Sequence, residues 1–391
     1  MSNSFHIPYG KQDITQSDID AVVETLKADF LTQGPKVLEF EESFAKYVGA
    51  KYAVALSNGT AALHLGLMAL GVKEGDRIIT SPITFAASAN AALYCGAEVY
   101  FADIDPDTYV ISLAEIEKLL SQHPKGYFKA IVPVDFGGYP VDTEKLRTLA
   151  DQYGTAILED ACHAPGAYFV NSKGEQERSG AGNYSDATVF SFHPVKHIAA
   201  GEGGMLTTNS EEIYKSVATL RTHGITKENM EMDFPNASDQ GSWYYEMQEL
   251  GYNYRITDIQ AALANSQLEK ADKGIERRQE IARKYRAAFK GTAINSQLFD
   301  ENHFNAHHLY VIEVENRKAL YEDLRTHHIF SQIHYIPVHL LPYYRKLGWN
   351  IGDFPIAEKY YEKCISLPMY PTLTEEEQDF VIQKVIYFVN A

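Results

Sequence analysis

One lysine lies where a chain could use its amine as a nucleophile. Lys196 follows the apolar, β-rich run 187–190, which reads as a buried strand, and precedes a second short strand over 205–208. It therefore lies on a tight connection between two strands, next to Phe192 and the glycines of 201–204. Burial lowers the pKa of a lysine and frees its amine to form a Schiff base. A surface lysine on a hairpin is the alternative, and this stretch alone does not decide between the two.

A turn early in the chain could bind an anion. The run 52–56 reads as a buried strand and passes through the small residues 57–60 into a helix that begins at Ala61. A helix start leaves backbone N–H groups unpaired, and the helix dipole favours a negative group there. The turn is therefore a candidate phosphate site, although a plain helix cap would also explain Ser57 and Thr60. It contains no Walker or GxGxxG sequence, so nucleotide cofactors of those types are not indicated.

Three further side chains lie at the ends of predicted strands. Asp160 ends the strand 156–160, Ser191 follows the strand 187–190, and Phe85 lies between a strand and a helix. Pyridoxal phosphate requires groups of these kinds: an anion site for its phosphate, a face for its ring, a carboxylate for its ring nitrogen and a lysine for its aldehyde. Together with the lysine and the turn, these side chains form a set that would suit this cofactor.

The elements that must hold these residues alternate along the first half of the chain. Strands are predicted over residues 77–80, 98–101, 130–134 and 156–160, and helices over residues 85–94, 112–122 and 141–153. This alternation predicts an α/β fold with a mostly parallel sheet and helices on both faces. Ligands bind such sheets beyond the carboxyl ends of the strands, where Asp160, Phe85 and the 57–60 turn would meet.

The pattern of elements divides the chain into an N-terminal arm and two domains. We expect the arm over residues 1–12, the large domain over residues 13–250 and a smaller α+β domain over residues 251–391. A long helix is predicted to run from about Asp258 to Phe289, and it could break near Gly274. The polar run 223–245 is predicted to be a loop.

The overall composition is that of a globular protein. Its 391 residues suffice for two domains, its hydrophobic fraction of 45% is ordinary, and its net charge is −17. No cluster of lysines and arginines forms the basic face of a nucleic-acid binder. The three cysteines lie far apart without metal-ligand spacing, which favours a reducing compartment. Since no signal peptide and no apolar run of ~20 residues is present, we expect a cytoplasmic protein without a membrane segment.

Five segments carry a family resemblance. They are 57–64 (SNGTAALH), 159–164 (EDACHA), 191–196 (SFHPVK), 201–204 (GEGG) and 251–262 (GYNYRITDIQAA). Together they resemble the sugar aminotransferases of the DegT/DnrJ/StrS type, and the resemblance covers nearly the whole chain. It implies the aspartate-aminotransferase-like fold, which is fold type I of the transferases that depend on pyridoxal 5′-phosphate. Members that act as dehydratases have histidine in place of the lysine, so Lys196 implies transamination.

The resemblance also implies a role for particular residues. Lys196 resembles the Schiff-base lysine, and Asp160 resembles the partner of the cofactor's ring nitrogen. The other cofactor contacts in the same chain would be Gly59, Thr60, Ala61 and Ser191 at the phosphate, and Phe85 and His163 beside the ring. Asn253 would reach the phosphate bound by the other subunit of a homodimer, so that each active site is shared. A turn residue at the start of a helix is the alternative for Asn253.

Within the family, the likeness is greatest to members that aminate C4 of UDP-4-keto-6-deoxy-L-N-acetylaltrosamine on the way to pseudaminic acid. The supporting segments are 81–90 (SPITFAASAN), 191–204, 221–225 (RTHGI) and 333–339 (IHYIPVH). The resemblance implies L-glutamate as the amino donor and a nucleotide keto-sugar as the acceptor. Two alternatives stay open: a different keto-sugar, carried by UDP in the D-configuration or by dTDP, and a non-catalytic regulatory protein that binds the cofactor.

A UDP-sugar brings a diphosphate with about two negative charges, which requires local cationic or N–H donors. The candidates for contact with the sugar nucleotide are Arg221, His223, His334, Tyr335 and His339. The alternative is a structural salt bridge for Arg221 and local packing for the histidines. Several of the 14 histidines gather over 303–339, but no HxH or HExxH pattern accompanies them, and no metal site is predicted.

Overall fold

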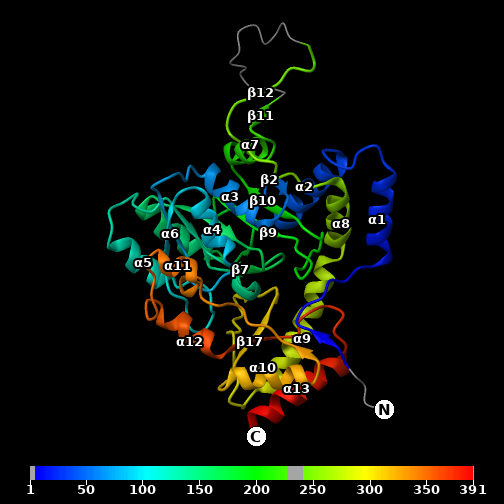
Figure 1. Cartoon of the computed structure of the whole chain (residues 1–391), viewed down its shortest axis with the longest axis vertical. Coiled ribbons are helices and arrows are strands. Elements are labelled where there is room, and N and C mark those ends of the chain that lie inside the picture. The colour runs from blue at the N-terminus through cyan, green and yellow to red at the C-terminus, as the bar shows by residue number, and fades with distance from the viewer. Residues whose placement is uncertain (1–4, 227–240, 391) are drawn as a thin grey trace.

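The computed structural model describes residues 5–226 and 241–390, and its centre is a seven-stranded sheet (Figure 1). The strands are β2 (Tyr52–Leu56), β3 (Arg77–Thr80), β4 (Glu98–Phe101), β5 (Ala130–Val132), β6 (Ala156–Asp160), β9 (Ala187–Ser191) and β10 (Gly204–Thr208). They lie in the order β2, β10, β9, β6, β5, β3, β4. Strand β10 runs antiparallel to both neighbours, and the other pairings are parallel. The predicted α/β fold with a mostly parallel sheet is therefore confirmed.

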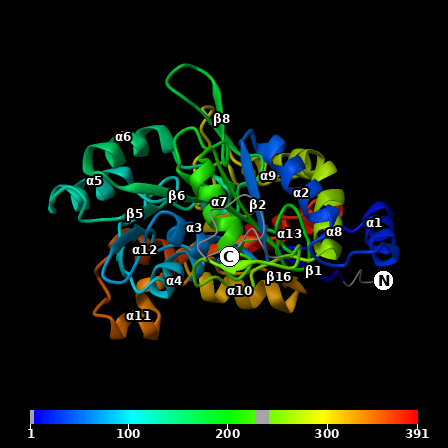
Figure 2. The same cartoon turned by 90° about the horizontal axis from the view of Figure 1, so that it is seen from above.

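Each face of the sheet packs on its own helices. Leu56 and Leu206 share one core with α3 (Gly59–Ala69), whereas Ala55 and Met205 share another with α2 (Pro35–Val48) and α8 (Asp258–Glu269). Side chains of a strand point alternately to opposite faces, so the buried residues of β2 and β10 fill the cores on both faces of the sheet. Helices α5 (Leu113–Ser121) and α6 (Thr143–Tyr153) lie at one end of the domain and α1 (Gln16–Lys27) at the other (Figures 1 and 2).

Side-chain caps fix where several of these helices begin. Asn58 for α3, Ser112 for α5, Asp142 for α6 and Ser210 for α7 (Glu211–Leu220) each accept an N–H bond from the first turn. Helix α4 (Ala87–Tyr94) begins two residues after Phe85, where the sequence predicted its start. Phe85 therefore precedes the helix on the segment that follows β3.

The C-terminal part of the chain has a core of its own. Its elements are α9 (Ala271–Phe289), β13 (Asn295–Ser296), β15 (Tyr310–Glu313), α10 (Arg317–Thr326), β16 (Ile329–Phe330), β17 (Cys364–Leu367) and α13 (Glu375–Asn390). Ile7 of the N-terminal arm is fully buried in this core, because β1 (Ile7–Pro8) pairs in parallel with β16. The predicted long helix is two helices, α8 and α9, which meet at Lys270 and not at Gly274.

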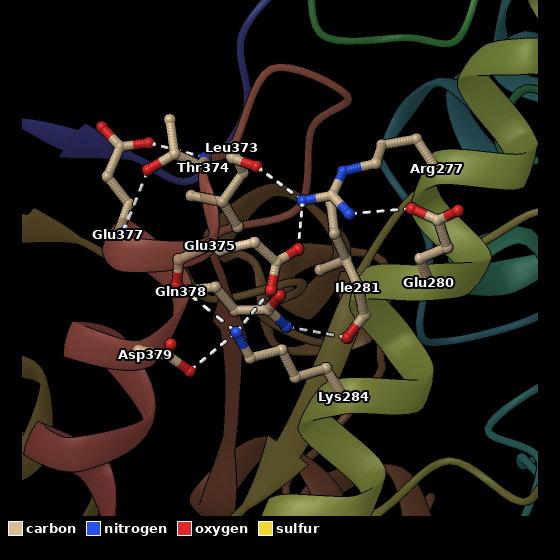
Figure 3. A network of polar contacts seen from close by, with 10 residues as sticks. All are labelled: Arg277, Glu280, Ile281, Lys284, Leu373, Thr374, Glu375, Glu377, Gln378 and Asp379. Atoms are coloured by element: carbon tan, nitrogen blue, oxygen red, sulfur yellow. Dashed lines mark hydrogen bonds and ion pairs between the residues drawn. The ribbon is translucent and has the colours of Figure 1, made fainter.

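Polar contacts join α9 to α13 at the surface of this part (Figure 3). Arg277 and Lys284 of α9 bind the carboxylate of Glu375 at 2.9 and 2.5 Å, and Lys284 also binds Asp379 at 2.7 Å. The two carboxylates stay largely exposed to solvent. The network therefore holds the two helices together without burying a charged group.

One C-terminal segment packs on the sheet domain. Helices α11 (Pro342–Lys346) and α12 (Pro355–Lys363) contribute Tyr344 and Tyr360 to the core that contains α3. Asp103, which follows β4, accepts the N–H groups of Ile356 and Ala357, both at 2.9 Å, and so holds the start of α12. The division into an arm and two domains at residues 12 and 250 stays a prediction.

The remaining strands form two small sheets. Strands β7 (Tyr168–Val170), β8 (Gln176–Arg178) and β14 (His303–Phe304) make one, and β11 (Ile225–Thr226) and β12 (Glu246–Met247) make the ribbon at the top of Figure 1. The loop predicted over 223–245 includes 227–240, which lie outside the described residues. Within the described ranges, no helix is long and apolar enough to cross a membrane.

Candidate active site

A cavity of about 730 Å³ lies beyond the carboxyl ends of the parallel strands. Its wall comes from the segments that follow β2, β3, β6 and β9, and from a C-terminal segment at residues 334–335. The predicted site residues that line it are Gly59, Thr60, Ala61, Phe85, Asp160, His163, Ser191, Lys196, His334 and Tyr335. A cavity of this size accommodates a cofactor together with part of a substrate.

The connection between β9 and β10 places Lys196 in the cavity wall. The backbone N–H of Lys196 donates to the carbonyl of His193 at 2.8 Å and closes a turn after β9. Burial lowers the pKa of Lys196 from 10.5 to about 8, although Cys162 and Asp160 act to raise it. About one such amine in ten is unprotonated at pH 7, compared with fewer than about one in a thousand for a solvated lysine. Lys196 therefore lies on the wall of a cavity with a lowered pKa, which suits a nucleophile, and it is not a surface lysine on a hairpin.

Asp160 lies at the end of β6 with its carboxylate held on both oxygens. The side chain is 5% exposed. Its Oδ2 accepts a hydrogen bond from the hydroxyl of Ser88 at 2.7 Å, and its Oδ1 accepts the N–H of Cys162 at 3.2 Å. The hydroxyl of Thr84 lies 2.7 Å from that of Ser88 and so orients it. The arrangement fixes a carboxylate in the wall, where it can hold a proton on a ring nitrogen.

The start of α3 leaves donors for an anion. Asn58 Oδ1 accepts the N–H of Ala61 at 2.8 Å, so the cap uses the third helical N–H. No described residue accepts the N–H of Gly59 or Thr60, and both residues line the cavity. With the helix dipole behind them, these two N–H groups form an anion site.

The glycines near this turn are explained by close approach. A Cβ on Gly59 would lie 3.0 Å from the Cβ of Ser191 and 3.3 Å from the sulfur of Cys162. A Cβ on Gly204 would lie 2.4 Å from the backbone carbonyl of Asn58. The contact at Gly204 leaves no room for a side chain, so β10 can meet the start of α3 only at glycine, whereas the contacts at Gly59 are tight.

Aromatic and imidazole groups gather on another side of the cavity. Phe85 is 63% exposed, and its ring centroid lies 6.2 Å from that of Tyr335. His163 is buried; its Nε2 lies 3.2 Å from the hydroxyl of Tyr335, and its ring centroid lies 4.3 Å from that of His308. Phe85 and His163 therefore both reach the space where the expected cofactor ring would lie.

Three candidate sugar contacts lie away from the cavity of this chain. Arg221 pairs with Glu41 at 2.5 Å and donates to the carbonyl of Ala55 at 2.7 Å, which is the structural salt bridge offered as its alternative. His339 is fully buried and lies 3.0 Å from Glu358. His223 is exposed on a turn at a positive φ of 60°.

His334 reaches the cavity but does not supply the expected cation. Its Nδ1 lies 2.8 Å from the hydroxyl of Ser366. Burial, and then the charge of Lys196, lowers the pKa of His334 to about 3, so the ring is neutral at pH 7. Asn253 is exposed and does not line the cavity of its own chain. Its contact with the cofactor of a second subunit stays a prediction.

Several wall residues escaped the sequence analysis. Ser88, which holds Asp160, lies inside a predicted helix, and its hydroxyl gives no sign of a partner 72 residues away. Tyr9 comes from the N-terminal arm, and His308 comes from a run of histidines that carries no spacing pattern. Nδ1 of His308 is buried without a protein partner among the described residues. Within those residues, no group of three or more His, Cys, Asp or Glu is placed to hold a metal ion.

The groups on the wall fit pyridoxal phosphate. The free N–H groups at the start of α3 suit its phosphate, Phe85 offers a face for its ring, and the fixed carboxylate of Asp160 suits its ring nitrogen. The desolvated amine of Lys196 suits its aldehyde. All four parts open on one cavity, so the donor set agrees with the cofactor expected from the sequence.

Comparison with known proteins gives the same answer. Residues 12–386 match the model of the DegT/DnrJ/EryC1/StrS aminotransferase family. The spore coat polysaccharide biosynthesis protein SpsC of Bacillus subtilis is 40% identical over 97% of this chain and 96% of its own. The UDP-4-amino-4,6-dideoxy-N-acetyl-beta-L-altrosamine transaminase of Campylobacter jejuni is 37% identical over 96% of this chain and 95% of its own.

Solved structures of sugar aminotransferases have the same fold. One from Streptococcus pneumoniae, in its PLP-form, has a TM-score of 0.88 at 29% identity and covers 99% of this chain and 98% of its own. Helicobacter pylori PseC, an aminotransferase of pseudaminic acid biosynthesis, has a TM-score of 0.87 at 30% identity and covers 99% of this chain and 100% of its own. The chain therefore belongs to the DegT/DnrJ/EryC1/StrS aminotransferase family, with pyridoxal 5′-phosphate as its cofactor.

Proposed function

We propose that the protein transfers the amino group of L-glutamate to C4 of a UDP-4-keto-6-deoxy-N-acetylhexosamine of the UDP-4-keto-L-altrosamine type, in pseudaminic acid biosynthesis. One observation carries the reaction class: the desolvated amine of Lys196 and the fixed carboxylate of Asp160 open on one cavity. The likeness to the Campylobacter transaminase and to PseC, over nearly the full length of the chain, supports the choice of substrate.

Each residue of the cavity wall would have its own role in the reaction. Bound pyridoxal phosphate supplies a ring that accepts the electron pair left when a C–H bond beside the amino group breaks. The amine of Lys196 would hold the cofactor through its aldehyde and, when free, would move the proton between the substrate carbon and the cofactor carbon. Asp160 holds the proton on the ring nitrogen, and Ser88 keeps its carboxylate in place. The same groups act in reverse when the keto-sugar is aminated.

We also propose a homodimer with shared active sites. Lys196 is the single lysine or arginine among the described residues that line the cavity, and Asp160 and Glu202 oppose it. A nucleotide diphosphate and the two carboxylates of glutamate need more positive charge than this wall offers. The missing donors would come from a second copy, in which Asn253 reaches the cofactor phosphate.

An exposed apolar surface supports this assembly. It consists of Ile19, Val23, Leu26, Phe30, Leu31 and Leu38. Such side chains on α1, α2 and the segment between them favour burial against another copy. Subunit mixing tests the proposal, because inactive Lys196→Ala and inactive Asn253→Ala chains should regain activity as a heterodimer with one intact site. No recovery after verified exchange would count against sharing, provided that Asn253→Ala alone is inactive.

The substrate alternatives are a UDP-linked D-sugar and a dTDP-linked keto-sugar. The similarity to SpsC, a protein of spore coat polysaccharide biosynthesis, is the reason to test both alternatives. The deciding experiment offers a panel of nucleotide keto-sugars with glutamate and identifies the products by mass spectrometry and NMR. Preferred amination of the altrosamine-type sugar is the expected result, and preference for a dTDP-sugar would refute the proposed substrate.

A non-catalytic protein that binds the cofactor is the alternative from another class. The intact pair of Lys196 and Asp160 favours an enzyme. Glutamate added alone should convert the cofactor to its amino form and abolish the visible band of the loaded protein; an unchanged band would favour the non-catalytic alternative. We propose a cytoplasmic location, because Cys95, Cys162 and Cys364 are all free thiols.

A further inference from the structure

His163 is held in one tautomer by its surroundings. Its Nδ1 lies 3.2 Å from the backbone N–H of Gly137. A backbone N–H can only donate, so Nδ1 must accept and carries no proton. Burial, followed by the charge of Lys196, lowers the pKa of His163 well below its usual value. The ring is therefore neutral at pH 7, and its single proton lies on Nε2.

This proton fixes the direction of the next hydrogen bond. Nε2 of His163 lies 3.2 Å from the hydroxyl of Tyr335. Since Nε2–H donates, the hydroxyl oxygen of Tyr335 accepts. Burial raises the pKa of Tyr335, so the hydroxyl keeps its own proton. That proton must be given to another acceptor.

The remaining surroundings of Tyr335 leave the cavity as the place for that acceptor. The neighbouring rings are His334 at 4.9 Å, Phe136 at 6.1 Å and Phe85 at 6.2 Å between centroids. Among the described residues, His163 is the one hydrogen-bond partner of the Tyr335 hydroxyl. Tyr335 lines the cavity wall together with Lys196 and Asp160. The hydrogen bonds from Gly137 through His163 to Tyr335 thus point in one direction and end at the cavity.

We propose that the hydroxyl of Tyr335 donates a hydrogen bond to an oxygen of the group bound in the cavity, and that His163 is the positioning residue that sets the direction of this bond. Two bound groups offer such an oxygen: the phenolic oxygen on the cofactor ring, and a carbonyl or hydroxyl oxygen of the keto-sugar. The second source rests on the proposed function, whereas the first requires the cofactor alone.

The tautomer is tested first, on the wild-type protein before cofactor is added. With ¹⁵N-labelled histidine, the ring signals of His163, assigned by comparison with His163→Gln, should show a protonated Nε2 and a bare Nδ1 across pH 6–8. A proton on Nδ1, or a charged ring in this range, would overturn the proposal without any variant having to be active.

The hydrogen bond is tested by Tyr335→Phe, with Tyr344→Phe as the matched control. Tyr344 is a buried tyrosine outside the cavity whose hydroxyl donates to Asn90 at 2.7 Å. If the acceptor is the cofactor oxygen, Tyr335→Phe should raise the pH midpoint of the cofactor's visible band by about 1–2 units, without any substrate present. If the acceptor belongs to the keto-sugar, the band stays unchanged and the KM for the keto-sugar rises about tenfold, while that for glutamate does not.

Variants of His163 separate positioning from simple support of the fold. His163→Leu should reproduce the Tyr335→Phe change in part, because the hydroxyl loses the donor that directs it. His163→Gln should restore the wild-type behaviour, since an amide can accept from Gly137 and donate to Tyr335. If Tyr335→Phe matches Tyr344→Phe in the band titration and in both KM values, the proposal fails. The tautomer and the band midpoint need no sugar, so they remain decisive even if the proposed sugar is the wrong one.

Discussion

Two lysines of this protein are placed in opposite environments. Lys284 lies on the surface of α9, where ion pairs with Glu375 and Asp379 surround its amine (Figure 3). Burial acts to lower the pKa of Lys284, but the bonds to Asp379 and Glu375 outweigh it and raise the pKa. Lys196 lies on the cavity wall, where burial dominates and lowers its pKa to about 8. The pKa of the same side chain is thus raised in one place and lowered in the other.

The difference shows what a reactive lysine requires of the fold. Around Lys284, two acids are close enough to keep the proton, so the charge serves only to hold α9 against α13. Around Lys196, the carboxylate of Asp160, which acts to raise the pKa of the amine, is already held by Ser88 and by the N–H of Cys162. A lysine of low pKa therefore needs a desolvated amine without a strong ion-pair partner, and the residue type alone does not supply that.

The largest expected effect comes from removing the reactive amine. Lys196→Ala should abolish amino transfer, because the amine both attaches the cofactor and moves the proton. Lys284→Ala is the matched control: it should leave activity unchanged and cost less than about 1 kcal/mol of stability, since it breaks exposed pairs. Steady-state assays with thermal unfolding measure both. Activity of Lys196→Ala within tenfold of the wild type would show that another group does this work.

Asp160→Asn should keep the cofactor bound but slow the glutamate half-reaction by about 10²–10⁴-fold, the range for a positioned proton-holding group. The amide cannot hold the positive charge of a protonated ring nitrogen. Asp379→Asn, which changes an acid paired with Lys284, should leave the rate as it is. Single-turnover measurements with glutamate give the comparison. An unchanged rate in Asp160→Asn would mark Asp160 as a structural acid at a strand end.

The pH dependence of cofactor attachment should report the lowered pKa of Lys196. The unprotonated amine is the nucleophile, so the rate of covalent attachment should rise with pH and level off above a midpoint near 8. Between pH 6 and pH 8 the unprotonated fraction grows about 50-fold. Stopped-flow absorbance of apoenzyme mixed with pyridoxal phosphate measures it. A rate that still climbs steeply at pH 10 would place the amine in solvent-like surroundings, as at Lys284.

Arg221 belongs with the paired cations, although it is more buried than Lys284. Its partner Glu41 also accepts the N–H of Ala55 at 2.8 Å, so removing the arginine leaves a partly buried carboxylate without its counterion. Arg221→Met should cost about 3 kcal/mol of stability. It should not change the ratio of the KM values for keto-sugar and glutamate. A selective rise in the KM for the keto-sugar would restore Arg221 as a substrate contact.

The sequence was sufficient for the residues whose place follows from the sheet. Asp160 and Lys196 could be predicted because strand ends and the connection after a buried strand meet at one edge of a parallel sheet. The sequence did not show that Arg221 and His339 lie outside the cavity, because their partners, Glu41 and Glu358, become neighbours only through packing of helices. The bond between Ser88 and Asp160 was missed for a related reason. Pairings across long stretches of chain leave no local pattern to read.

The central claim is that Lys196 holds the cofactor in a cavity built for it. Reduction of the loaded wild-type protein with borohydride, followed by peptide mapping by mass spectrometry, tests this directly. The cofactor should be found on the peptide that contains Lys196 and on no other lysine, and Lys284→Ala should give the same map while Lys196→Ala gives no labelled peptide. A label on a different lysine, or equal labelling of Lys196→Ala, would contradict the claim.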